Sequence, residues 1–116
     1  MANPIRLENA EHYLWGTHCE GWHLVRAPEL SVIQERVPPG ERETRHAHAR
    51  ARQFFFVLEG EAVLEVRGQR HTLSARSGLE IEPGAPHQFR NESDRDVIFL
   101  VISQPPGQGD RLPAET

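Results

Sequence analysis

The sequence predicts an all-β protein built from antiparallel strands. Turn-forming Gly, Pro, Asn and Ser residues recur roughly every eight to twelve positions, and the segments between them are short and rich in apolar residues. These segments do not alternate with helical patterns, so a parallel sheet made of βαβ units is not expected. About eight short strands favour an antiparallel sandwich, barrel or jelly roll.

The first half of the chain carries the earliest expected strands. Residues 23–26 and 30–37 are the first apolar stretches, and the second of them ends at a Pro-Pro-Gly turn. Residues 54–58 and 62–66 follow, separated by a short turn that contains Gly60. Two strand-like runs around such a turn predict a β-hairpin.

The second half contains the remaining strands, which we expect at residues 70–73, 79–81, 87–90 and 97–103. Near the start of the chain, Asn9 to Leu14 is expected to form one or two helical turns capped by Asn9. The tail from Pro105 is expected to be irregular, because it is rich in Pro and Gly.

The length of 116 residues fits a single domain, 1–116, with a core at about 23–103. Residues 1–22 would then be an N-terminal arm and residues 104–116 a C-terminal tail. The longest apolar run, Val97 to Ile102, is far shorter than the ~18 residues needed to span a bilayer. The first residues lack a charged segment followed by an apolar one. We therefore expect a cytoplasmic protein with no membrane partner.

Charge and residue types exclude several function classes. Thirteen cations against seventeen anions give a net charge of −4, so a nucleic-acid partner is not expected. Every cation is an arginine, which excludes chemistry that needs a lysine amine, such as Schiff-base formation. Cys19 is the single cysteine, so neither an internal disulfide nor a multi-cysteine zinc cluster can form. Seven histidines are many for this length.

The first candidate for chemistry is His46-Ala47-His48. On a strand, residues two apart point to the same face, so both imidazoles would project into one space. Two neutral imidazoles suit Zn, Fe, Ni, Cu or Mn. The motif alone is weak, because two solvent-facing histidines near a loop would produce the same letters.

The surroundings of these histidines resemble the cupin superfamily. Its first motif sets His-x-His between two glycines, matched here by Gly40, His46, His48 and Gly60. Its second motif places a histidine and an asparagine after a Gly/Pro turn, matched by Gly78, Pro83, Gly84, His87 and Asn91. The resemblance implies a jelly-roll β-barrel (a double-stranded β-helix) that holds one divalent metal ion: Fe, Mn, Ni, Zn or Cu.

Carried over to this chain, the resemblance implies metal ligands His46, His48, His87 and Gln53. Gln53 stands where the family has a glutamate, and the family's Pro-x-Gly is shortened to Pro83-Gly84. The Gln53 amide would either bind the metal directly or hold a metal-bound water or the substrate. Since three imidazoles and an amide leave the full charge on the metal, we expect a small-molecule ligand that is anionic or an oxygen chelator.

The strand that begins at Gln53 predicts two different faces. If Gln53 points inward, Phe55 and Val57 line an apolar cavity around the histidines. Phe54, Phe56 and Leu58 then point outward and need a cover, from the N-terminal segment or from a second subunit. The resemblance to small cupins also implies a homodimer.

For the other notable residues, the sequence favours structural or solvent-exposed positions over a place in the site. His71 is expected to be structural or exposed, and Arg50 and Arg52 to lie on a solvated loop beside the motif, where they could also meet an anionic ligand. The N-terminal stretch is expected to form a packed lid or a dimer arm, and it contains His12, Tyr13, Trp15, His18, Cys19, Trp22 and His23. No carboxylate is required to be a general base; candidates by nearness to strands are Glu35, Glu65 and Glu82.

The resemblance therefore implies a metal-binding cupin, with an oxygenase or isomerase-type activity on a small molecule. The alternative is a non-catalytic module whose pocket binds or senses a small molecule. A third class is a purely structural dimeric protein, in which loss of His87 would change neither metal content nor thermal stability.

Overall fold

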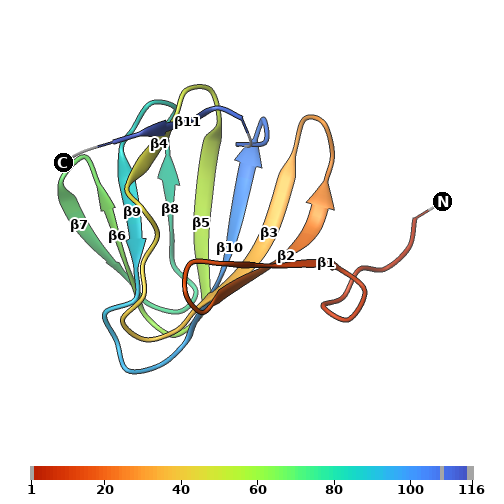
Figure 1. Cartoon of the computed structure of the whole chain (residues 1–116), viewed down its shortest axis with the longest axis horizontal. Coiled ribbons are helices and arrows are strands. Elements are labelled where there is room, and N and C mark those ends of the chain that lie inside the picture. The colour runs from red at the N-terminus through yellow and green to blue at the C-terminus, as the bar shows by residue number, and fades with distance from the viewer. Residues whose placement is uncertain (1, 108, 115–116) are drawn as a thin grey trace.

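The computed structural model describes residues 2–107 and 109–114, which form strands and turns without a helix. Two antiparallel sheets make up the fold (Figure 1). The larger sheet has six strands in the order β1-β2-β3-β10-β5-β8. Their bounds are β1 Glu11–Trp15, β2 Cys19–Arg26, β3 Ser31–Val37, β5 Arg52–Glu59, β8 Gly78–Ile81 and β10 Val97–Gln104. Within the described ranges, no helix meets the length and apolarity that crossing a bilayer requires.

The smaller sheet has five strands in the order β11-β4-β9-β6-β7. Their bounds are β4 His46–His48, β6 Ala62–Val66, β7 Gln69–Leu73, β9 His87–Arg90 and β11 Arg111–Pro113. The all-β prediction is confirmed. The strands β1 and β11, and the start of β2, extend the sheets beyond the core predicted at residues 23–103.

The hydrophobic core lies between the two sheets. Along β5 and β10, alternate residues are buried, as the two-residue period of a strand requires. The rings of Phe89 from β9 and Phe99 from β10 stack with centroids 3.9 Å apart, so one side chain from each sheet meets the other. This packing fixes the separation of the sheets and so sets the positions of the strands that carry polar side chains inward.

The predicted helix at Asn9 to Leu14 is wrong. Residues Glu11–Trp15 form β1, which pairs with β2 and places Tyr13 opposite Gly21. A Cβ atom at Gly21 would lie 2.4 Å from Cζ of Tyr13, so the glycine leaves room for the phenol ring. Pairing with β2 provides backbone hydrogen bonds that outweigh the weak local helical preference.

The predicted hairpin of residues 54–58 and 62–66 is also wrong. β5 pairs with β10 and β8 in the larger sheet, whereas β6 pairs with β7 and β9 in the smaller one. Gly60 has φ +85°, and an added Cβ would lie 2.5 Å from the Asp96 carbonyl oxygen. The glycine turn therefore carries the chain from one sheet to the other instead of folding it back.

The tail is not entirely irregular, because Arg111–Pro113 forms β11 and pairs with β4. β4 is a three-residue strand whose other neighbour is β9, so β11 covers the edge that β4 would otherwise expose. Figure 1 shows β4 and β11 along the upper edge of the molecule and the β9–β10 loop along the lower edge.

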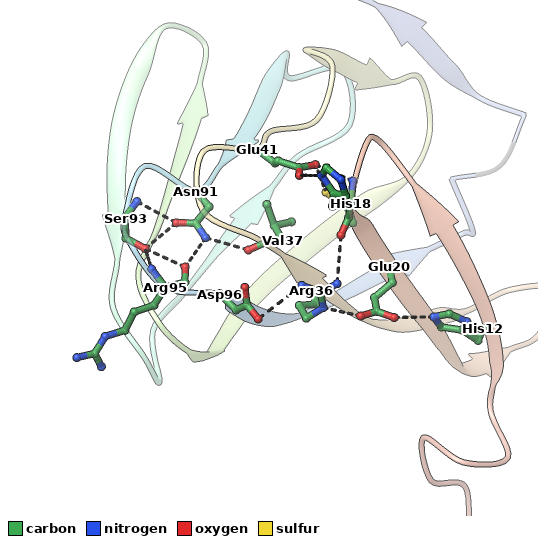
Figure 2. Close-up of polar contacts among 11 residues, drawn as sticks. His12, His18, Glu20, Arg36, Val37, Glu41, Asn91, Ser93, Arg95 and Asp96 are labelled. Carbon is green, nitrogen blue, oxygen red and sulfur yellow. Dashed lines mark hydrogen bonds and ion pairs between the residues drawn. The ribbon is translucent and has the colours of Figure 1, made fainter.

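At the lower edge, the buried amide of Asn91 organises the β9–β10 loop (Figure 2). Its Nδ2 donates to the carbonyl oxygens of Val37, at 2.8 Å, and Arg95, at 2.6 Å. Its Oδ1 accepts from the backbone N–H and the hydroxyl of Ser93. Nearby, Arg36 pairs with Glu20 of β2 at 2.5 Å. These contacts bind the loop and the N-terminal hairpin to β3.

Candidate metal centre

Three buried histidines converge between the sheets. His46 and His48 lie on β4, and His87 begins β9 directly opposite His46 in the strand register. The exposed fractions of these three residues are 4%, 8% and 0%, in that order. One ring nitrogen from each lies within 4.8 Å of the other two. Three imidazole nitrogens at this separation can coordinate one metal ion.

Each imidazole is oriented by a hydrogen bond from its Nδ1–H. His46 donates to the Thr44 carbonyl at 2.9 Å, and His87 donates to the Ala85 carbonyl at 2.9 Å. His48 donates to Oδ1 of Asp110 at 2.7 Å. Because these acceptors hold the proton on Nδ1, the lone pair of each neutral ring lies on Nε2.

The donor atoms fit a metal ion. His87 Nε2 is buried and has no hydrogen-bond partner in the described part of the chain. A buried polar atom without a partner is costly, and a bound ion would remove that cost. Burial, foremost, lowers the pKa of His46 to about 3 and also lowers the pKa of His87. Both rings are therefore neutral, as a metal ligand must be.

Gln53 of β5 presents an amide to the same space. Its Nε2 donates to the Ser103 hydroxyl at 3.0 Å, and its Oε1 is buried without a partner among the described residues. Gln53, His46 and His48 line one cavity of about 360 Å³. The free amide oxygen is thus available to a metal, a water or a ligand.

The cavity is apolar on one side. Ile33, Phe55 and Val101 belong to its wall. Val57, which was expected to line it, is fully buried in the core and is not part of the wall. His87 is not among the residues of the wall, although its ring nitrogen belongs to the histidine cluster. Two of the three clustered histidines, His46 and His48, therefore border the cavity.

Two carboxyl groups and one guanidinium complete the cavity. Glu35, Glu43 and Arg111 line it, and they also line an adjoining cavity of about 410 Å³ beside Tyr13 and Trp15. Desolvation raises the pKa of Glu35 to about 7, although the Tyr13 hydroxyl donates to its Oε2 at 2.6 Å. Desolvation, with the nearby Glu35 carboxyl, raises the pKa of Glu43 to about 8.

Arg111 is the cation of this site. Its guanidinium donates to the Thr44 carbonyl at 3.3 Å, and it makes no ion pair with the carboxylates of residues 2–107 and 109–114. An unpaired guanidinium on a cavity wall is suited to a carboxylate or another anion. Sequence reasoning missed Arg111 and Asp110 because they follow a Pro- and Gly-rich stretch that carried no strand signal, and it missed Glu43 in an irregular loop.

Other residues named from the sequence lie elsewhere. Glu65 is buried between Arg45 and Arg90, and Glu82 pairs with Arg67 at the surface. His71 lies on β7, outside the histidine cluster. Arg52 pairs with Glu80. Of the three glutamates considered from the sequence, Glu35 alone reaches the cavity.

Two curated relatives share part of this sequence. The polyketide synthase CurC of Streptomyces cyaneus is 36% identical over 67 residues, which are 58% of this chain and 44% of CurC. The HTH-type transcriptional regulator PuuR of Escherichia coli is 36% identical over 64 residues, which are 55% of this chain and 35% of PuuR. The chain thus spans less than half the length of either relative.

Solved structures show the same fold at low sequence identity. KdgF from Halomonas sp. superposes with a TM-score of 0.84 at 16% identity, covering 93% of this chain and 97% of that one. The polyketide cyclase RemF from Streptomyces resistomycificus gives 0.85 at 17% identity, covering 100% and 87%. A protein from Thermotoga maritima described as a predicted oxalate decarboxylase gives 0.82 at 18% identity, covering 90% and 100%.

A match to a family profile, which covers most of the strands, shows the family of this chain. The profile of the cupin domain family matches residues 33–103, which include both histidine motifs. These residues are more than half of the chain, and the fold and the histidine cluster agree with the match. The protein belongs to the cupin domain family.

Proposed function

We propose that this cupin is a metal-dependent enzyme of the isomerase type, which moves protons on a small anionic or chelating molecule. The observation that carries the proposal is that two protonatable carboxyl groups, Glu35 and Glu43, line one cavity together with two members of the histidine cluster, His46 and His48. One divalent metal ion would be held by His46, His48 and His87, with Gln53 as the fourth group.

A metal ion bound there would supply Lewis acidity, polarising an oxygen atom of the ligand. The protein groups around it divide the remaining tasks. Arg111 would bind a carboxylate or another anionic oxygen of the ligand. Glu35, whose pKa is raised to about 7, can hold or accept a proton near neutral pH. Ile33, Phe55 and Val101 keep one side of the cavity apolar and limit water.

The donor set differs from the facial triad of many non-haem iron oxygenases. Non-haem iron oxygenases commonly use two histidines and one carboxylate, whereas the cluster in the described part of this chain has three histidines beside an amide. The neutral donors leave the full charge of a divalent ion to the ligand, which supports the choice of an anionic or chelating molecule.

The chain is proposed to form a single jelly-roll domain that pairs into a homodimer. On β5 and β10, the side chains facing away from the core are only partly buried, and Phe54 is 39% exposed. A second copy against this face would cover these side chains. Light scattering at micromolar concentration should give the mass of two chains, and the mass of one chain would contradict the dimer.

The function is tested with protein purified without chelators. We expect about one equivalent of divalent metal by elemental analysis, and metal-dependent deuterium incorporation from D₂O into simple 2-oxo acids, detected by proton NMR. His46→Ala should lose both the bound metal and the deuterium incorporation. The control His71→Ala, a substitution on β7 outside the cluster, should keep both.

Three other outcomes would contradict the proposal. Oxygen uptake with diketones or catechols, without deuterium incorporation, would identify an oxygenase. Tight binding of these probes without any turnover would favour the binding or sensing module, in line with the match to part of a transcriptional regulator. If the wild type bound no metal and His46→Ala changed neither measurement, the remaining interpretation would be a purely structural protein.

A further inference from the structure

The carboxylate of Asp110 is fully engaged by two different parts of the site. The residue is 7% exposed. Its Oδ1 accepts the Nδ1–H of His48 at 2.7 Å. Its Oδ2 accepts the backbone N–H groups of Arg50 and Ala51, both at 2.9 Å. One side chain thus holds a candidate metal ligand with one oxygen and the loop after β4 with the other.

The backbone around Asp110 docks the strand that carries the cation. The Asp110 carbonyl accepts the Ala49 N–H at 3.0 Å, and β11 begins at the next residue. In the β4–β11 pair, Arg111 lies opposite His48. Gly107 also packs on the His48 ring, since a Cβ there would lie 2.7 Å from Cε1. The tail and the second histidine of the motif therefore share one set of contacts.

We propose that Asp110 is a positioning residue with two separable tasks: Oδ1 fixes the tautomer of His48, and Oδ2 docks the strand that places Arg111 in the cavity. This inference rests on the proposed function, because it assigns a residue that prepares both the metal-binding and the anion-binding groups. Asp110 is not a member of the histidine cluster and acts through His48 and Arg111.

The chemistry of an amide separates the two tasks. In Asp110→Asn, one oxygen remains for three N–H donors. If that oxygen keeps the two backbone N–H groups, the new NH₂ group faces His48 Nδ1, which must then accept a hydrogen bond. The His48 proton moves to Nε2, and the lone pair needed by a metal is lost. The strand stays docked while the imidazole is turned into the wrong tautomer.

Alanine removes both tasks. In Asp110→Ala, the N–H groups of Arg50 and Ala51 lose their acceptor, and β11 keeps only backbone contacts: the Ala49 N–H bond to the carbonyl of residue 110 and the pairing with β4. The Arg111 guanidinium, on an exposed strand and bonded only to the Thr44 carbonyl, is then held less firmly in the cavity. The two variants therefore predict different patterns, which a general loss of stability would not produce.

Four measurements distinguish these patterns. Metal affinity is measured by Co²⁺ titration followed by its visible absorption, and anion affinity by oxalate titration at saturating Co²⁺. The His48 tautomer is read from ¹⁵N chemical shifts of the metal-free protein, and docking of β11 from hydrogen exchange of its backbone amides. Glu82→Gln, which changes a surface carboxyl group paired with Arg67, is the control.

For Asp110→Asn we expect Co²⁺ affinity reduced about 10- to 100-fold and a reversed His48 tautomer, with β11 exchange and oxalate affinity unchanged. For Asp110→Ala we expect the same order of loss in Co²⁺ affinity, together with faster β11 exchange and an oxalate affinity as low as that of Arg111→Gln. Glu82→Gln should match the wild type in all four.

The proposal is overturned if Asp110→Asn binds Co²⁺ as tightly as the wild type, or if β11 stays protected in Asp110→Ala. Failure of the proposed function looks different: the wild type itself would bind no Co²⁺. The tautomer and exchange measurements use metal-free protein, so in that case they would still support or refute the positioning role.

Discussion

Two buried amides, Asn91 and Gln53, occupy opposite ends of this fold and differ in how completely they are bonded. Asn91 donates to two carbonyl groups and accepts from two groups of Ser93. Gln53 makes one bond, to Ser103, and leaves its oxygen buried without a partner in the described part of the chain. Both lie within motifs that resemble those of cupins, yet their surroundings give them different tasks.

The number of hydrogen bonds that each buried amide makes distinguishes a structural role from a role in binding. A buried polar group that makes all of its hydrogen bonds stabilises one conformation, because breaking any of them leaves a buried polar atom without a partner, which costs free energy. A buried polar group with an unused atom keeps that atom for something else, such as a ligand or an ion. By this criterion, the lower edge of the molecule has a structural role, and the cavity beside β4 is the candidate site for a ligand or an ion.

The largest expected effect is on stability at the Asn91 end. Asn91→Ala removes the amide donor to the carbonyl groups of Val37 and Arg95, of which Arg95 keeps the Ser93 hydroxyl as a donor at 3.1 Å, so we expect a loss of about 3 kcal/mol in the free energy of unfolding. Urea denaturation of the metal-free protein measures it. Asn9→Ala, at an exposed site, should cost less than about 1 kcal/mol. Equal losses in the two variants would remove the contrast between the two ends.

The next effect is on metal affinity at the Gln53 end. Gln53→Glu places a carboxylate where the free amide oxygen lies, so we expect divalent metal to bind about tenfold more tightly. The affinity of the metal-loaded protein for oxalate should fall, since the metal then carries less charge. Competition with a chelating dye measures the first quantity. If Gln53→Glu behaves like the exposed-site control Gln69→Glu, Gln53 does not face the metal.

The smallest expected effect is a pH dependence from Glu43, a carboxyl group with one hydrogen bond, to the Phe89 N–H. Burial raises its pKa from 4.5 to about 8, so between these values the folded state binds a proton that the unfolded state releases. Stability of the metal-free protein should therefore fall as the pH rises through this window. Glu35 contributes in the same direction up to about pH 7.

Glu43→Gln stays neutral and should make this decline shallower. The measurement is best made from pH 6.5 to 8, because His46, whose pKa is lowered from 6.5 to about 3, acts in the opposite direction only below that range. Thermal unfolding at several pH values would show the slope. A wild type and variant with parallel curves would mean that Glu43 is ionised in the folded protein at all these values.

Part of the histidine cluster could be predicted from local sequence, because two histidines two apart on a strand share a face. The third histidine, His87 at the start of β9, was joined to them only by the resemblance to the cupin motifs. The path of the chain between the two sheets was harder to predict from the sequence. The Gly60 turn has the same letters whether the chain folds back or crosses to the other sheet, and only the partners of β5 and β6 distinguish the two.

The residues that complete the site could not be found from the sequence, because their partners are far away in the chain. Asp110 bonds to His48 across 62 positions, and Tyr13 bonds to Glu35 across 22. β11 is an exposed three-residue strand with a proline at its end, so it has no pattern of its own. It is a strand because β4 offers it an edge.

The pairing of β4 with β11 has a consequence for synthesis on the ribosome. His46, His48 and His87 all emerge before residue 110, whose carboxylate sets the proton on one of these rings. A nascent chain that is still short of that residue holds the three imidazoles without the last orienting group. Translation therefore completes the arrangement of the candidate metal ligands late, after both sheets have their other strands, and a chain truncated before residue 110 would lack the group that orients His48.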